Sequence, residues 1–71
     1  MSRVPVESTS AVGVGYCPVT GVLEVEFVSG GVYQYLGVPV DEHAALMSAS
    51  SKGRHINTKI KGRFGYREVL R

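Results

Sequence analysis

Residues 10–36 carry three stretches in which apolar side chains recur at every second position, the spacing of β-strands that bury one face. In the first stretch the larger side chains share one side and the other side is bare: Val12, Val14 and Tyr16 stand against Ala11, Gly13 and Gly15. Glycine is tolerated inside a strand where another backbone lies close. We therefore expect a helix or a partner to rest on the bare side.

The next two stretches predict a hairpin. In residues 22–28 the apolar positions face inward and two glutamates face water, and a glycine-rich turn at 29–31 leads into residues 32–36. A two-residue loop would leave Tyr33 and Tyr35 beside the glutamates, whereas a three-residue loop would place them with the apolar side chains. A one-residue change of register exchanges the two faces, so the sequence leaves both arrangements open.

The second half of the chain predicts one longer and one short helix. The first begins at Val38-Pro39, where proline suits the first turn and two acidic residues follow. It ends by Lys52-Gly53, with Gly53 expected as a left-handed cap. Ile56 and Ile60, spaced i to i+4, indicate a short second helix that Gly62 stops.

The predicted fold class is α+β: a three-stranded antiparallel meander followed by one longer and one short helix. Residues 64–70 then dock as a tail or form a last short strand. A chain of 71 residues has room for a single core, so we expect one domain over residues 1–71, with residues 1–8 as a flexible start. Its 44% hydrophobic and 20% charged residues are typical of a globular protein.

Cysteine usage and hydropathy bear on the cellular compartment. The one cysteine, Cys17, cannot form a disulfide within the chain, and residues 1–5 lack the apolar run of a secretion signal. No apolar stretch approaches the roughly 20 residues that cross a bilayer. We therefore expect a cytoplasmic protein that is not inserted in a membrane.

The net charge of +2 hides a division along the chain. Residues 1–51 hold one basic and five acidic residues, whereas residues 52–71 hold seven basic residues and one acidic residue. A cationic segment attracts phosphate-rich partners, and it is also a common solubilising feature. The basic end is the main functional indication, and both interpretations stay open.

Candidate catalytic and metal-binding residues are few. His43 and His55 stand apart from any cysteine pair or HExxH spacing that would complete the ligand set of a metal. Cys17 adjoins a proline in a turn, without the glycine-rich elbow that frames a nucleophile. We expect no enzymatic activity, no metal site and no cofactor.

Two local patterns allow both a binding and a structural interpretation. Lys-Gly-Arg occurs at 52–54 and at 61–63, each time where we expect a helix to finish. Each turn either holds a phosphate or caps a helix. Tyr33 and Tyr35 share one face of a strand, where they either stack on unpaired bases or pack in the core.

From about Ser10 to Tyr66 the sequence resembles the KTSC domain, a short module found at the carboxyl end of some lysyl-tRNA synthetases and as a stand-alone protein. The resemblance runs through Gly15-Tyr16, Gly21-Val22-Leu23-Glu24-Val25-Glu26-Phe27, Gly31-Val32-Tyr33-Gln34-Tyr35, Val38-Pro39, Ser51-Lys52-Gly53-Arg54, Asn57 and Ile60. The central Tyr-x-Tyr is its most recognisable motif. Cys17, His43 and Gly65 depart from the family pattern. The resemblance implies RNA binding through the synthetase context, and it implies no catalytic residue.

We therefore predict a non-catalytic binding module for RNA or single-stranded nucleic acid, in which basic side chains neutralise phosphates and two tyrosines stack on bases. The candidate residues are Lys52, Arg54, Lys59, Lys61, Arg63, Arg67, Tyr33 and Tyr35. The alternative is a protein-interaction or self-assembly module, in which the bare side of the first strand or a sheet edge pairs with a partner protein or a second copy.

Overall fold

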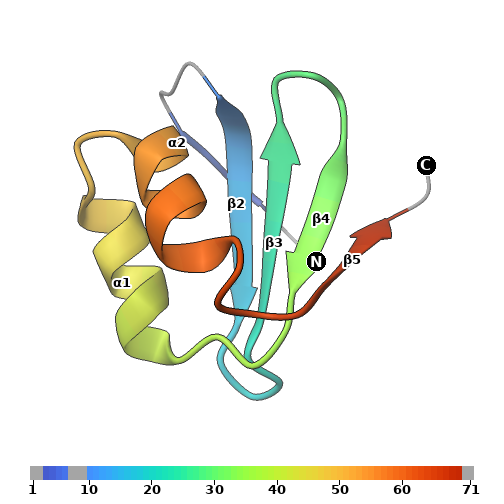
Figure 1. Ribbon diagram of the computed structural model, residues 1–71, viewed down its shortest axis with the longest axis vertical. Helices are drawn as coiled ribbons and strands as arrows, with labels where there is room; N and C mark the ends of the chain where they lie inside the picture. Colours follow the sequence, from blue (N-terminus) through green and yellow to red (C-terminus); the bar gives the residue numbers. More distant parts are fainter. Residues whose placement is uncertain (1–2, 7–9, 70–71) are drawn as a thin grey trace.

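A computed structural model describes residues 3–6 and 10–69 and shows one antiparallel sheet with helical segments on one face (Figure 1). The elements are β1 (Val4–Pro5), β2 (Ala11–Cys17), β3 (Val22–Phe27), β4 (Val32–Tyr35), α1 (Val40–Ser48), α2 (Lys52–His55), η1 (Ile56–Ile60) and β5 (Tyr66–Val69). The strands lie side by side in chain order, β1-β2-β3-β4-β5. The α+β class is confirmed. The predicted three strands correspond to β2, β3 and β4, and β1 and β5 extend them to a five-stranded sheet.

Both added strands come from the ends of the described chain. Val4 and Pro5 pair with β2, within the segment 1–8 that the sequence analysis treats as a flexible start. Residues 1–2 and 7–8 of that segment lie outside the described residues. At the other end, β5 is the last short strand that was one of the two alternatives for residues 64–70, and Leu70 lies outside the described residues.

A β-bulge in β2 exchanges the predicted faces at the start of that strand. Ala11 pairs with Phe27, but Gly13 pairs with Glu26, so Val12 is an extra residue without a partner position. Ala11 consequently lies in the core, while Val12 is 46% exposed. The prediction that Val12 lies on the same side of the strand as Val14 and Tyr16 is wrong, because a strict two-residue alternation cannot reveal one inserted residue.

Gly13, on the bare side of β2, is covered by Arg3, the residue before β1, whereas Ala11 lies in the core with residues of the helical segments. A side chain added at Gly13 would meet the Cβ of Arg3 at 3.4 Å. From this position the guanidinium forms ion pairs with Glu24 and with Glu26, the latter with a distance of 3.3 Å between Nε and Oε1. The small residues of β2 therefore leave room for an arginine side chain that ties β1 to β3.

The hairpin between β3 and β4 has the three-residue loop Val28-Ser29-Gly30. The amide of Phe27 donates to the carbonyl of Gly31 at 2.8 Å, and Gly30 takes a φ of +99°, which favours glycine. Tyr35 lies opposite Leu23 and Tyr33 opposite Val25. Of the two arrangements that the sequence leaves open, the structure therefore has the one with both tyrosines on the apolar face.

The junction between α1 and α2 differs from its prediction. Ser51 starts α2, because its hydroxyl accepts a hydrogen bond from the amide of Arg54 at 3.3 Å. Gly53 consequently lies inside α2 and is not a left-handed cap. A Cβ at this position would lie 2.4 Å from Ser10 Oγ and 2.8 Å from Ser10 Cβ, so glycine is required here for close helix–strand packing.

The short second helix is a π-helical turn. The amide of Lys61 donates to the carbonyl of Ile56 at 2.8 Å, five residues back. Ile56 and Ile60 are both completely buried, as their spacing predicts. Gly62, with a φ of +83°, ends the turn and sends the chain toward β5.

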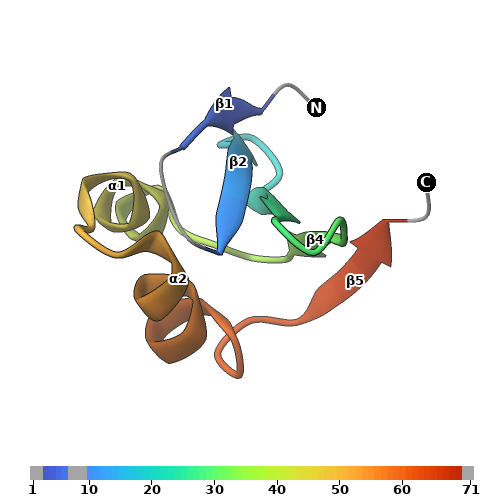
Figure 2. The ribbon, with the colours of Figure 1, turned by 90° about the horizontal axis from the view of Figure 1, so that it is seen from above.

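The helical segments cover only part of the sheet. The core packs their buried residues Leu46, Ile56 and Ile60 against Val14, Leu23 and Val25 of β2 and β3. In Figure 2, α1 and α2 lie at the β2 side of the sheet, while β5 lies at the opposite end. The part of the sheet near β4 and β5 is therefore left without a helix above it.

Candidate functional site

The uncovered part of the sheet forms a groove of about 660 Å³ between the hairpin, η1 and β5. Four of its lining side chains are aromatic and come from three adjacent strands, and a lysine and a glycine close the side nearest η1. The members used below are Phe27, Tyr33, Tyr35, Tyr66, Lys61 and Gly62. We call this feature the aromatic groove. Its size lies within the range of small-ligand sites.

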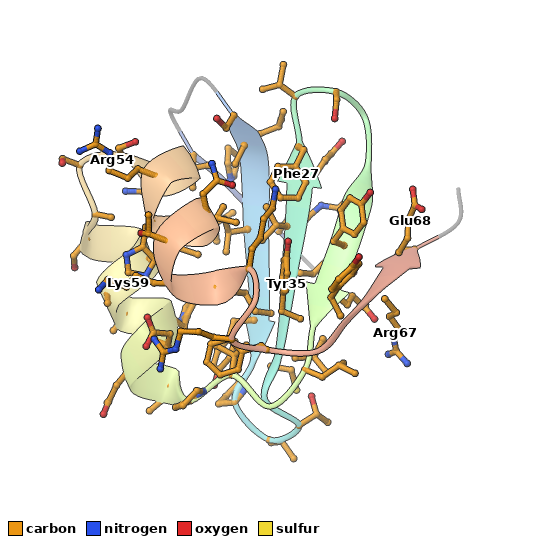
Figure 3. All side chains as sticks on the ribbon, in the orientation of Figure 1. Phe27, Tyr35, Arg54, Lys59, Arg67 and Glu68 are labelled. Carbon is orange, nitrogen blue, oxygen red and sulfur yellow. The ribbon has the colours of Figure 1, made fainter. Side chains whose placement is uncertain are left out.

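The four aromatic rings form a continuous cluster. Tyr33 makes edge contacts with Phe27 on one side and Tyr66 on the other, each with ring centroids 5.7 Å apart. Tyr35 and Tyr66 lie 5.9 Å apart. Figure 3 shows Phe27 and Tyr35 along the middle of the sheet, beside the last helical turn. The cluster presents ring faces and edges to a ligand that enters the groove.

The tyrosines of the groove differ in burial, which separates their roles. Tyr35 is 2% exposed and belongs to the core. Tyr33 is half-buried, and Tyr66 is 63% exposed. Burial raises the pKa of the Tyr35 hydroxyl above its ordinary value, and the neighbouring Tyr33 and Tyr66 add to this rise. A flat ligand can therefore stack on the exposed Tyr66 ring, next to the half-buried Tyr33, whereas the ring of Tyr35 is not available for stacking.

Lys61 is the basic residue of the groove. Its Nζ lies 5.2 Å from the centroid of the Phe27 ring, a cation–π contact. The π-helical turn and Gly62 place it there, because the chain leaves the helical segment at this residue. Lys61 is exposed, so its ammonium group is accessible to an anion at the rim of the groove.

Two of the other side chains that were predicted to bind phosphate form hydrogen bonds or ion pairs within the fold. Lys52 Nζ donates to the carbonyls of Met47 at 3.0 Å and Ala49 at 2.6 Å, at the end of α1. Arg63 contacts Glu42 at 3.4 Å, and its guanidinium lies 5.3 Å from the Phe64 ring. For Lys52 the structure supports the helix-capping interpretation of the first Lys-Gly-Arg.

The remaining three predicted phosphate ligands lie away from the groove. Arg54 and Lys59 project from the outer side of the helical segments, and Arg67 lies on β5 at the far end of the sheet (Figure 3). Arg67 donates through Nε to Gln34 Oε1 at 2.8 Å. Because Gln34 alternates with Tyr33 and Tyr35 along β4, this bond lies on the opposite face of the sheet. The structure brings Lys61 alone of the six basic candidates into the groove.

The face opposite the helices carries a polar network centred on Glu24, which is 5% exposed. Gln34 Nε2 donates to Glu24 Oε1 at 2.8 Å, and Arg3 donates to its other oxygen. Burial alone would raise the pKa of Glu24, but the hydrogen bonds from Gln34 and Arg3 outweigh it and lower the pKa below its ordinary value. These contacts satisfy the buried carboxylate and join β3, β4 and the residue before β1.

The histidines and the cysteine that were considered for catalysis or metal binding make contacts within the fold. His43 stacks on Tyr16 with centroids 4.4 Å apart, and burial lowers its pKa. His55 Nε2 lies 3.3 Å from Glu42 Oε1. Hydrogen bonds that the Cys17 sulfur accepts from Thr20 lower the pKa of this thiol. Within residues 3–6 and 10–69, no three histidine, cysteine or acidic side chains gather as a metal site, and no helix is long and apolar enough to span a bilayer.

Two groove residues escaped the sequence analysis. Phe27 was assigned to the apolar face of its strand, and Tyr66 to a segment that either docks as a tail or forms a last short strand. The signal for Tyr66 is the pairing of β5 with β4, which places it directly opposite Tyr35. This pairing joins distant parts of the chain, so no local pattern predicts it.

Comparison with known proteins identifies the family. The KTSC domain model matches residues 7–64. The chain belongs to the KTSC domain family. A KTSC domain protein from Yersinia pestis, known from a crystal structure, is 45% identical, with a TM-score of 0.94 and 97% of each chain covered. The predicted resemblance to the KTSC domain is therefore confirmed.

Relatives of this KTSC domain occur in two settings. An uncharacterised protein from Stutzerimonas stutzeri is 46% identical over 61 residues, which is 86% of each chain. A lysine–tRNA ligase from a Nostoc species is 41% identical over 54 residues, which is 76% of this chain and 10% of the ligase. The domain thus occurs both in short proteins and as a small part of a synthetase.

Proposed function

We propose that this KTSC domain is a non-catalytic module that binds single-stranded RNA in the aromatic groove. The observation that carries the proposal is the exposed Tyr66 ring next to the Tyr33 edge, with the Lys61 ammonium at the rim. Aromatic side chains that stack on unpaired bases and a cation that meets the backbone are the shared features of single-strand binding surfaces.

The proposed site is smaller than the one expected from the basic segment. Four phosphate contacts would give a slope of about −3 for log affinity against log salt, whereas the single groove cation Lys61 gives a slope of about −0.7. Stacking then supplies most of the affinity, at about 1 to 3 kcal/mol per base. Binding is expected to be weak and to depend little on salt.

The experiment is fluorescence anisotropy with a labelled RNA of about ten nucleotides, across a salt series, for the native protein and Tyr66→Ala. Tyr66 is largely exposed, so its removal is expected to leave the melting temperature nearly unchanged and to weaken RNA binding about tenfold. Val19→Ala is a matched control, since Val19 is 91% exposed and lies outside the groove. Unaltered binding by Tyr66→Ala would exclude the groove as the RNA site.

A second candidate function is association through β5. This strand ends the sheet order, so its outer edge has no neighbouring strand among the described residues. Such an edge accepts a strand from a partner protein or a second copy. Light scattering over a concentration series tests self-association, and a constant monomer mass up to about 100 μM would count against pairing between copies at the affinities of weak interfaces.

A further inference from the structure

The hydroxyl of Tyr35 is a polar group without a protein partner at the floor of the aromatic groove. The residue is 2% exposed, and its hydroxyl forms no hydrogen bond with any of the described residues. Buried phenolic hydroxyls normally have a hydrogen-bond partner, because an unsatisfied one loses its bonds to water. The Tyr35 hydroxyl therefore keeps its hydrogen-bonding capacity free for a molecule that enters the groove.

Tyr16 shows the usual arrangement in the same sheet. Its hydroxyl donates to the carbonyl of Val38 at 2.6 Å and so fixes the segment before α1. Both tyrosines lie on the helix-facing side of the sheet, in one cross-strand row, because each pairs with Leu23. The hydroxyl of Tyr16 thus forms a hydrogen bond within the fold. The hydroxyl of Tyr35 is available for a hydrogen bond to a ligand.

The Tyr35 hydroxyl remains accessible from the groove. In the described part of the chain, His55 Nε2 is the one fully buried side-chain nitrogen or oxygen without a hydrogen-bond partner. The Tyr35 hydroxyl also has no partner, but it is not one of the fully buried atoms, so its oxygen keeps some accessible surface. Tyr35 lines the groove, and this surface therefore faces the groove. Because burial raises its pKa, the group stays protonated at neutral pH and is able to donate.

We propose that the Tyr35 hydroxyl hydrogen-bonds to the edge of an unpaired nucleobase whose ring stacks on Tyr66. The proposal rests on the proposed RNA binding and assigns the polar contact of the same groove. A phosphate is less suited to this position, because a charged group at an apolar floor loses its hydration, whereas Lys61 offers a charge at the exposed rim. The base therefore lies inside the groove and the backbone at its rim.

The test compares Tyr35→Phe with Tyr16→Phe, each of which removes one hydroxyl and keeps the ring. Tyr35→Phe is expected to weaken binding of a labelled RNA of about ten nucleotides roughly fivefold to tenfold, with an unchanged salt slope and no loss of thermal stability. Tyr16→Phe is expected to lower the melting temperature and to leave the affinity unchanged well below that temperature.

A measurement on the native protein guards against misfolding of either variant. With ring-labelled tyrosine, the NMR signals of Tyr35 and Tyr66 should shift on addition of the RNA, while those of Tyr16 should stay in place. If the native protein binds RNA and Tyr35→Phe binds it equally well, the assignment of Tyr35 is overturned and the proposed function stands. If the native protein binds neither oligouridine nor oligoadenosine RNA, the proposed function itself fails, and this inference fails with it.

Discussion

The two Lys-Gly-Arg tripeptides have the same sequence and opposite roles in the fold. In residues 52–54 the lysine bonds to carbonyls at the end of α1, and the glycine is buried against Ser10. In residues 61–63 the lysine reaches the aromatic groove, and the glycine has a positive φ with open space where a Cβ would lie. The comparison shows that a repeated motif need not be a repeated site.

The difference arises from what surrounds each tripeptide. The first forms the start of α2, where Lys52 bonds back to the end of α1 and Gly53 packs against Ser10, so this tripeptide joins elements of the fold. The second follows the π-helical turn and crosses to β5 at the uncovered part of the sheet, where Lys61 has a solvent-exposed position. The first copy is therefore expected to affect stability and the second to affect binding.

Alanine substitution of the two glycines should give the largest contrast. Gly53→Ala forces a Cβ to within 2.4 Å of Ser10 Oγ, and the expected loss of stability is about 2 to 3 kcal/mol. Gly62→Ala meets no atom but takes a φ of +83°, at a cost of about 1 to 2 kcal/mol. Urea unfolding of both variants measures these values.

A compensating change sharpens this contrast. Ser10→Gly removes both atoms that the new methyl group would meet, so in the Gly53→Ala background it should restore part of the lost stability. The same change should not rescue Gly62→Ala. Equal losses for the two alanine variants, or no rescue by Ser10→Gly, would contradict the account of the first tripeptide.

Replacement of the two lysines by methionine should give the next largest effect, because methionine keeps most of the side-chain length and removes the charge. Lys52→Met loses two hydrogen bonds to α1 and is expected to lower stability by about 1 kcal/mol with RNA affinity unchanged. Lys61→Met should change stability by less than about 0.5 kcal/mol, since its side chain is exposed. Thermal melts of the two variants compare these effects.

The smallest expected effect concerns the salt dependence of binding. Lys61→Met should reduce the slope of log affinity against log salt by about 0.7, the contribution of one phosphate contact with a single strand. Arg67→Met is the matched control, because Arg67 bonds to Gln34 on the other face of the sheet. A slope that falls equally in both variants would indicate binding through diffuse charge and not through the groove.

The sequence predicted the central strands well because their alternation is local. The pattern of residues 22–28 places β3 correctly, and the spacing of Ile56 and Ile60 predicts their burial. The face taken by the tyrosines depends on one residue in the loop before β4, which an apolar pattern cannot count. An apolar pattern also does not reveal the inserted Val12 or the pairing of β5 with β4, because both depend on contacts between strands.

The sequence predicted the types of residue in the candidate site, aromatic and basic, better than it predicted which of them lie together. Tyr33, Tyr35 and Lys61 do line one groove, but the other five candidates are spread over α2, η1, the segment between η1 and β5, and β5 itself. A helical turn changes direction every few residues, and a strand alternates between two faces, so neighbouring charges in a sequence point in different directions. Tyr66, the most exposed aromatic ring of the groove, is brought in by long-range pairing.

The central claim is that RNA binds in the aromatic groove, and an NMR titration of the isotope-labelled protein with single-stranded RNA tests it most directly. At about 100 μM protein and roughly 50 mM salt, within reach of weak nonspecific binding, amide shifts should concentrate at Phe27, Tyr33, Lys61 and Tyr66. The amides of α1 and α2 should stay in place. Shifts centred on Arg54 and Lys59, or no shifts at all, would contradict the account.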